Sequence, residues 1–162
     1  MSAAIDISIE SPRWAELPAA EETVRHAIEA ALADCGADGT EVSVALVDDA
    51  KIQELNRSWR GKDAATNVLS FPAPEQPRGG PRFLGDVALA FETIGREADA
   101  EAKPLAHHVA HLAVHGVLHL LGFDHERDAD AETMERRERD ILARIGVPDP
   151  YAPAAAKRTE PA

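Results

Sequence analysis

The stretch His115-Gly116-Val117-Leu118-His119-Leu120-Leu121-Gly122-Phe123-Asp124-His125 places three histidines and two glycines within eleven residues. On a helix, His115 and His119 are one turn apart, so both imidazole rings leave the same face about 6 Å apart. Gly122 tolerates a left-handed conformation, which would end the helix and turn the chain back. His125 can then join the other two rings. The spacing therefore predicts a metal site with His115, His119 and His125 as its ligands.

The same spacing matches the zinc peptidase pattern H-E-x-x-H-x-x-G-x-x-H at every position but one. Gly116 stands where such a peptidase carries its general-base glutamate. The pattern therefore still predicts the three metal ligands. The glutamate that acts as the general base in a zinc peptidase is absent. A glycine in mid-helix lowers stability by about 1 kcal/mol relative to alanine. Its presence indicates that a neighbouring element or the substrate passes close to the backbone at Gly116.

A single long helix, predicted over residues 104–121, carries most of the histidines. At about 100° per residue, its histidines share an arc of about 120°, and its other sides are apolar. Such a helix is expected to be buried, with the metal site opening along the histidine stripe. We expect His107, His108 and His111 to line the cleft or to hydrogen-bond the ligands, with a structural role favoured over direct chemistry.

The remaining pattern predicts an α+β fold, with a mixed sheet of about four strands packed with about five helices and a zincin-like central helix that carries the histidines. Strands are predicted at 5–9, 41–47, 67–71 and 84–91, and helices at 18–33, in a short segment after Asp48 or Asp49, at 93–102, and at 129–145. Residues 1–146 are expected to form one domain. The proline-rich residues 72–82 are expected to form a mobile loop, and residues 147–162 a disordered tail.

The composition restricts the location and the partners. The net charge of −12 argues against broad contact with nucleic acid, because phosphates bind Lys and Arg. Residues 51–82, however, carry six basic and three acidic side chains, so either a focused anion-binding patch or scattered solvated charges fits. The single Cys35 excludes internal disulfides. With no membrane-length apolar run and no signal peptide, a cytoplasmic protein without membrane contact is expected.

Four stretches, taken in order, closely resemble the YbeY family of bacterial endoribonucleases, and the likeness runs from about residue 5 to residue 145. The stretches are Leu55-Asn56-Arg57-Ser58-Trp59-Arg60-Gly61-Lys62-Asp63, Thr66-Asn67-Val68-Leu69-Ser70-Phe71-Pro72, Leu84-Gly85-Asp86-Val87, and His111-Leu112 followed by residues 115–125. Two positions depart from the family pattern. Phe123 stands where the family usually has Tyr, and Asn67 where Asp is common.

This resemblance implies a hydrolase: a single-strand-specific, metal-dependent endoribonuclease that matures ribosomal RNA, notably the 3′ end of the small-subunit RNA, and acts in ribosome quality control. It implies single-stranded and ribosomal RNA, the ribosome and ribosome-assembly proteins as partners. It makes His115, His119 and His125 the metal ligands and Arg60 a residue needed for activity. We expect one Zn²⁺ ion, although imidazoles also suit Ni²⁺ and other divalent metals.

The residues themselves suit phosphodiester chemistry. Three neutral imidazoles leave a divalent ion its full charge and an open position, which attracts an anion. Arg60 offers a planar fork of donors for a phosphate, and the alternative is a surface arginine stacked on Trp59. The general base is left open among activated water, the substrate and the carboxylates of Asp124, Glu126 and Asp86.

Two other functions stay open at this point. One is a metal-dependent hydrolase of another bond, including a zincin-like peptidase with a displaced base. The other is a non-catalytic ribosome-assembly factor with a structural metal. Structural zinc sites usually have four ligands, often Cys. Three histidines therefore favour catalysis.

Overall fold

A four-stranded mixed sheet forms the centre of this computed structural model, which describes residues 4–37, 39–74, 76 and 82–152. The strands are β1 (Ala4–Ile9), β2 (Thr40–Val47), β3 (Val68–Pro72) and β4 (Arg82–Ala90), in the order β1-β2-β4-β3. The pairs β1–β2 and β2–β4 are parallel, whereas β3 runs antiparallel to β4 at the edge of the sheet. The predicted α+β fold with a mixed sheet is confirmed.

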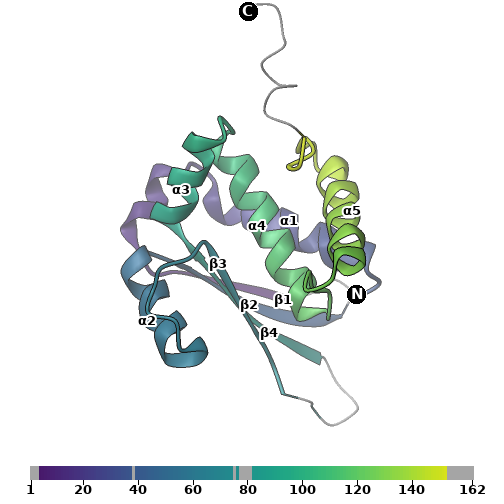
Figure 1. The fold of residues 1–162 in the computed structure, drawn as a ribbon, viewed down its shortest axis with the longest axis horizontal. Helices are drawn as coiled ribbons and strands as arrows, with labels where there is room; N and C mark the ends of the chain where they lie inside the picture. Colours follow the sequence, from purple (N-terminus) through teal and green to yellow (C-terminus); the bar gives the residue numbers. More distant parts are fainter. Residues whose placement is uncertain (1–3, 38, 75, 77–81, 153–162) are drawn as a thin grey trace, which may run out of the picture.

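The described residues contain five α-helices, and four of them lie on one side of the sheet. Figure 1 shows α4 across the sheet with α1 and α5 beside it, and α2 at the other side. None of these helices combines the length and apolar character needed to cross a membrane. Their bounds are α1 (Ala20–Asp34), α2 (Asp49–Arg60), α3 (Phe91–Ala100), α4 (Leu105–Leu120) and α5 (Asp128–Arg144), and a 3₁₀ helix spans Pro12–Glu16.

The two faces of the sheet support two hydrophobic cores of unequal size. Val87 and Leu89 of β4 point into the larger core, together with the buried faces of α1, α4 and α5. Ala88, between them, points into a smaller core with Ile52 of α2, as expected for side chains that alternate along a strand. The sheet thus separates α2 from α4 over most of their lengths, and the two helices approach a common cavity only beside the edge strand β3.

The end of α4 is fixed by its own backbone. Gly122 adopts a left-handed conformation with φ of 100°. Its N–H donates to the carbonyl of His119 at 3.1 Å, and the N–H of Phe123 donates to the carbonyl of Leu118 at 3.0 Å. This pair of bonds is the Schellman motif, which ends a helix and redirects the chain. The predicted role of Gly122 is confirmed, and the turn brings His125 back toward α4.

Some element boundaries differ from the sequence prediction because distant residues set them. Helix α3 begins two residues early, at Phe91. The Asp49 carboxylate accepts a bond from the N–H of Thr93 at 2.9 Å, and that of Glu92 accepts one from the N–H of Asp49 at 2.8 Å. Strand β3 includes Pro72, which an edge strand tolerates. Most of the predicted 72–82 loop, residues 75 and 77–81, lies outside the described residues.

The first residues of the predicted tail contact the folded body. The N–H of Val147 donates to the carbonyl of Leu142 at 2.9 Å, and Lys103 Nζ donates to the carbonyl of Pro150 at the same distance. The Tyr151 hydroxyl donates to Glu138. Residues 147–152 therefore differ from a tail without a buried face, because α5 and the loop before α4 supply their partners. Residues 153–162 lie outside the described residues, and their disorder stays a prediction.

Candidate metal centre

The three histidines of the opening stretch converge in space. The Nε2 atoms of His115 and His119 are 3.1 Å apart. The ring of His125 is stacked on that of His115, with centroids 5.7 Å apart and planes 25° apart, and lies 5.2 Å from that of His119. One potential ligand atom from each residue lies within 4.8 Å of the other two. The structure therefore brings together all three residues that the spacing selected.

This arrangement fits a single divalent cation. Zinc–nitrogen bonds of about 2.0 Å at a tetrahedral angle hold two ligand nitrogens about 3.3 Å apart, close to the separation between His115 and His119. Burial lowers the pKa of His119, and repulsion from His115 and His125 lowers it further. A lowered pKa favours the neutral imidazole, which is the form that binds a metal. His125 is exposed, so the cluster is open to solvent on one side.

A buried carboxylate contacts His115 at Nδ1, the ring nitrogen that does not face His119. Glu138 of α5 accepts a hydrogen bond from Nδ1 of His115 at 2.7 Å and contacts Nε2 of His111 at 2.8 Å. Burial alone would raise the pKa of Glu138, but the hydrogen bonds from His111, His115 and Tyr151 outweigh it and hold the pKa at about 2. The carboxylate is therefore ionised at neutral pH.

Glu138 is a functional residue that the motifs do not single out, although the sequence of α5 carries a signal for it. Met134, Ile141 and Leu142 are the other buried residues of α5, and Glu138 lies four residues after the first and three before the second. A glutamate in the middle of an apolar helical stripe is unusual, because its charge requires partners in the core.

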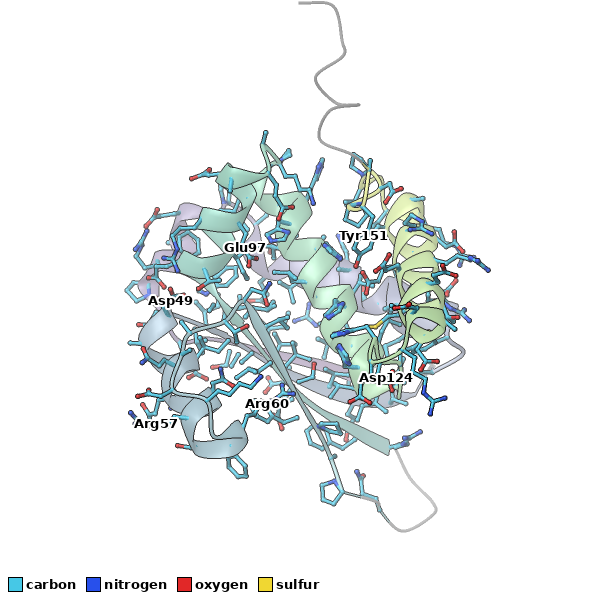
Figure 2. The ribbon with its side chains drawn as sticks, viewed as in Figure 1. Asp49, Arg57, Arg60, Glu97, Asp124 and Tyr151 are labelled. Carbon is cyan, nitrogen blue, oxygen red and sulfur yellow. The ribbon has the colours of Figure 1, made fainter. Side chains whose placement is uncertain are left out.

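The candidate centre lies in a cavity of about 660 Å³ beside the edge strand. Arg60 lines this cavity from the last turn of α2, where Gly61 ends the helix with φ of 70°. Figure 2 shows Arg60 at the end of α2 and Asp124 just after α4. The ring of Trp59 instead meets Phe71, with centroids 6.2 Å apart. The structure thus places Arg60 in the same cavity as the three histidines.

The candidate bases separate into two groups. Asp124 and Glu126 line the histidine cavity, and the Asp124 carboxylate also accepts a bond from the N–H of Glu126 at 3.3 Å. Asp86 lines a different cavity together with Trp59 and Phe71. Its neighbour Val87 faces α4, so Asp86 faces the other side of the sheet. The hypothesis that Asp86 serves as the base is therefore wrong.

The upstream histidines have partners of their own. Nε2 of His108 is 2.8 Å from a carboxylate oxygen of Glu97, and His111 contacts Glu138. Together with His107, they line a separate cavity of about 580 Å³ beneath residues 147–150. These three histidines therefore do not line the metal cavity, and the structural role favoured from the sequence agrees with their contacts.

Gly116 lies against the sheet. A Cβ atom at this position would be 2.8 Å from Cγ1 of Val87 and 3.2 Å from Cγ2 of Val68. The Ser70 hydroxyl also donates to the carbonyl of Gly116 at 2.8 Å. Of the two explanations offered by the sequence, a neighbouring element rather than the substrate accounts for this glycine.

The fold and the cavity together define an α+β protein with a candidate tris-histidine metal centre at the end of its central helix. The family model described as Endoribonuclease YbeY matches residues 7–146. The chain belongs to this family.

Individual relatives agree with the family match. A protein named Endoribonuclease YbeY from Rhodopseudomonas palustris is 57% identical over 152 residues, covering 91% of this chain and 80% of the relative. One of the same name from Azorhizobium caulinodans is 56% identical and covers 91% and 96%. The solution structure of TM1509 from Thermotoga maritima has a TM-score of 0.54 at 23% identity, covers 87% of this chain and 91% of that one, and shares the fold.

Proposed function

We propose that this protein is a single-strand-specific, metal-dependent endoribonuclease that acts in ribosomal RNA maturation, including the 3′ end of the small-subunit RNA, and in ribosome quality control. The proposal rests on membership of a family named for endoribonuclease activity. The observation that carries it is the meeting of His115, His119, His125 and Arg60 in one cavity.

The proposed roles of these residues follow from their chemistry. His115, His119 and His125 would hold one divalent ion, with Zn²⁺ as the leading candidate and Ni²⁺ as an alternative. When bound, such an ion supplies positive charge that polarises a phosphate and acidifies water.

The Arg60 guanidinium would donate two parallel hydrogen bonds to the phosphate that is attacked, because its planar fork matches two phosphate oxygens. Lys62, which also lines the cavity, adds a second positive charge for the RNA backbone. Asp124 and Glu126 both line the cavity, and the carboxylate of one of them would take a proton from the attacking water. An unpaired strand can bend its phosphate into this cavity more easily than a duplex can.

The peptidase alternative is not favoured. The position at which a zinc peptidase carries its glutamate is Gly116, and Val87, Val68 and Ser70 leave no room for a side chain there. A purely structural metal is not favoured either, because the three histidines lie on a cavity wall and His125 is exposed.

The wider setting is part of the same proposal. We place residues 1–146 in a single domain that works in the cytoplasm with single-stranded ribosomal RNA, the ribosome and ribosome-assembly proteins. The net positive charge of residues 51–82 supports an RNA partner, since Arg60 and Lys62 of that segment face the cavity while the rest of the chain is acidic.

The test is a cleavage assay with three substrates: a labelled single-stranded RNA, the same RNA in a perfect duplex, and a peptide. The protein should cut the single strand, cut the duplex far more slowly, lose activity with a chelator and regain it with Zn²⁺. Asp86→Asn, on the opposite face of the sheet, should behave like the wild type. Peptide cleavage, or RNA cleavage that persists in chelator, would contradict the proposal.

A further inference from the structure

Glu138 is a carboxylate at a position where a helix usually carries an apolar residue. Its side chain has no exposed surface, and it shares the buried face of α5 with Met134, Ile141 and Leu142. A buried carboxylate lowers stability unless hydrogen bonds replace its water shell. The partners that replace this water therefore indicate why the residue is there.

The bond to His115 determines which nitrogen of that ring is free. Oε1 of Glu138 accepts from the Tyr151 hydroxyl and lies 2.8 Å from Nε2 of His111, so the carboxylate acts as the acceptor in this cluster. His115 then donates from Nδ1 to Oε2 across 2.7 Å. A neutral imidazole carries one proton, which leaves Nε2 of His115 with its lone pair. This Nε2 lies 3.1 Å from Nε2 of His119, within the histidine cluster. Glu138 thus selects the tautomer that directs a lone pair into the candidate metal centre.

The other oxygen of Glu138 is held from two directions. Nε2 of His111 lies 2.8 Å from Oε1, and the Tyr151 hydroxyl donates to the same atom. Tyr151 comes from the segment after α5, and Figure 2 shows it between α4 and α5. Its ring meets that of His111 edge to face, with centroids 5.3 Å apart. This segment lies beyond residue 146, where the family match ends.

The segment that carries Tyr151 is itself anchored. Gly146 takes a left-handed conformation with φ of 80°, and the N–H of Val147 then bonds the carbonyl of Leu142 at 2.9 Å. Further along, Lys103 Nζ donates to the carbonyl of Pro150. The hydroxyl is therefore held against Glu138 by contacts with both α5 and the loop before α4.

His111, His115 and Glu138 also meet the distance criterion for a metal cluster, since their ligand atoms lie within 4.8 Å of one another. The separations of 2.7 and 2.8 Å are hydrogen-bond lengths, however, and are shorter than the roughly 3.3 Å expected between two nitrogen ligands of one tetrahedral zinc ion. The Tyr151 hydroxyl also donates a hydrogen bond to Oε1 of Glu138, so this oxygen is already engaged as an acceptor. The geometry therefore favours a hydrogen-bonded support over a second ion.

We propose that Glu138 is a positioning residue that fixes the tautomer and ring orientation of His115 for metal binding, and that Tyr151 completes this support from the C-terminal segment. The inference rests on the proposed function of the three histidines as metal ligands. Carboxylates that orient a ligating histidine typically change metal affinity by about 10- to 100-fold when they are removed.

The first test compares two glutamates that each hold a histidine of α4. Glu138→Gln keeps the shape and removes the charge, whereas Glu97→Gln does the same at His108, which contacts Glu97 at 2.8 Å. Competition with a chelator should give a zinc affinity about 10- to 100-fold lower for Glu138→Gln and unchanged for Glu97→Gln. Tyr151→Phe should lower the affinity in the same direction by less. Equal affinities for Glu138→Gln and the wild type would overturn the proposal.

The second test reads the tautomer directly in the metal-free protein. Nitrogen-15 NMR of the histidine rings should find His115 protonated at Nδ1 in the wild type and in Glu97→Gln, and a mixture of tautomers in Glu138→Gln. A wild-type His115 protonated at Nε2 would contradict the proposal. Because this experiment needs no metal, it separates failure of the positioning role from failure of the proposed function.

Two outcomes of these tests have separate meanings. If Glu138→Gln does not fold, Tyr151→Phe carries both measurements, because it removes only a hydroxyl of a partly exposed side chain. An unchanged affinity and an unchanged tautomer in that variant would overturn the role of Tyr151 and of the support it completes. Two zinc equivalents in the wild type, one of them lost in His111→Ala, would show that the cluster is a second metal site instead.

Discussion

The two halves of α4 carry histidines on one face, but the surrounding elements give them different chemistry. In the first half, His108 and His111 each contact a carboxylate, from α3 and α5 respectively. In the second half, His119 has no carboxylate contact among the described residues, and its Nε2 faces that of His115. The ring of His115 makes both kinds of contact, because its Nδ1 contacts Glu138 while its Nε2 faces His119. The candidate metal centre therefore lies where ring nitrogens of neighbouring histidines face one another in a cavity, rather than where each ring contacts a carboxylate.

The sharpest way to break this comparison is to delete one histidine from each half. His119→Ala should abolish RNA cleavage, by about 10³-fold or more, because the remaining two rings hold a metal ion poorly. His108→Ala should lose some stability and keep most of its cleavage rate per folded molecule, because His108 is bonded to Glu97 and lies outside the histidine cavity. The measurement is single-turnover cleavage of single-stranded RNA. Equal losses in both variants would mean that the two halves do not differ in function.

Substitution of Arg60 should separate metal binding from catalysis. Arg60→Ala should lower kcat by about 10²-fold, because a guanidinium that binds the reacting phosphate is lost. Metal content and unfolding temperature should stay at wild-type values, since Arg60 is exposed. Arg60→Lys should restore little, because a point charge does not replace a bidentate contact. A near-normal kcat for Arg60→Ala at equal metal occupancy would remove Arg60 from the mechanism.

Gly116 tests how closely the ligand half of α4 packs on the sheet. Gly116→Ala gains about 1 kcal/mol in helix propensity but forces a Cβ to within 2.8 Å of Val87, a stiff β-branched neighbour. Because overpacking of this kind costs about 1–3 kcal/mol, we expect a net loss of about 1 kcal/mol. Gly95→Ala, in the open middle of α3, should instead raise stability by up to about 1 kcal/mol.

Urea denaturation of the two glycine variants measures both effects. The sign of the change is the informative quantity, since the substitution is the same and only the surroundings differ. A stabilised Gly116→Ala would mean that the sheet can move away from α4 at little expense, and that the position of His115 is less firmly fixed than its packing indicates.

A smaller effect is expected at the clamp between α2 and α3. Burial alone would raise the pKa of Asp49, but hydrogen bonds from Arg96 and Thr93 outweigh it and hold that pKa below its usual value. A carboxyl with a lowered folded-state pKa stabilises the protein above its unfolded pKa, and that contribution is lost as the pH falls through the folded value. Asp49→Asn should therefore reduce the unfolding free energy by about 1 kcal/mol at pH 7.

The difference between Asp49→Asn and the wild type should shrink as the pH falls below about 4, the range in which the carboxyl of the unfolded chain becomes protonated. Denaturation at pH 7 and pH 3.5 measures this change. The variant should keep its metal, because Asp49 lies at the start of α2 and outside the histidine cavity. A stability difference that is the same at both pH values would rule out the carboxylate as its source.

The features that the sequence predicted depend on local spacing. The Gly122 turn and the convergence of His115, His119 and His125 follow from spacing within eleven residues. Helix α4 follows from the apolar pattern over its 16 residues, and the strands follow from alternation along short segments. The features that it did not predict depend on distant partners. The Asp49 carboxylate accepts a bond from the first turn of α3, at Thr93, 44 residues further along the chain, and Glu138 reaches His115 from another helix.

Two residues illustrate the limit of local patterns. Asp86 is a carboxylate within one of the four family stretches. The alternation of β4 nevertheless places it on the face of the sheet that α4 does not cover. Tyr151 lies in a stretch rich in Pro and Ala, whose composition predicts disorder, yet its hydroxyl reaches Glu138 because α5 ends beside it. In both cases the three-dimensional neighbour, rather than the residue type, decides the role.

Metal analysis of purified variants tests the central claim most directly. The wild-type protein and His108→Ala should each bind one equivalent of zinc after exposure to a modest concentration of chelator. Under the same conditions His125→Ala should bind none, because only His115 and His119 remain as ligands. Full zinc occupancy in His125→Ala, or loss of zinc from a folded His108→Ala, would contradict the assignment of the metal to His115, His119 and His125.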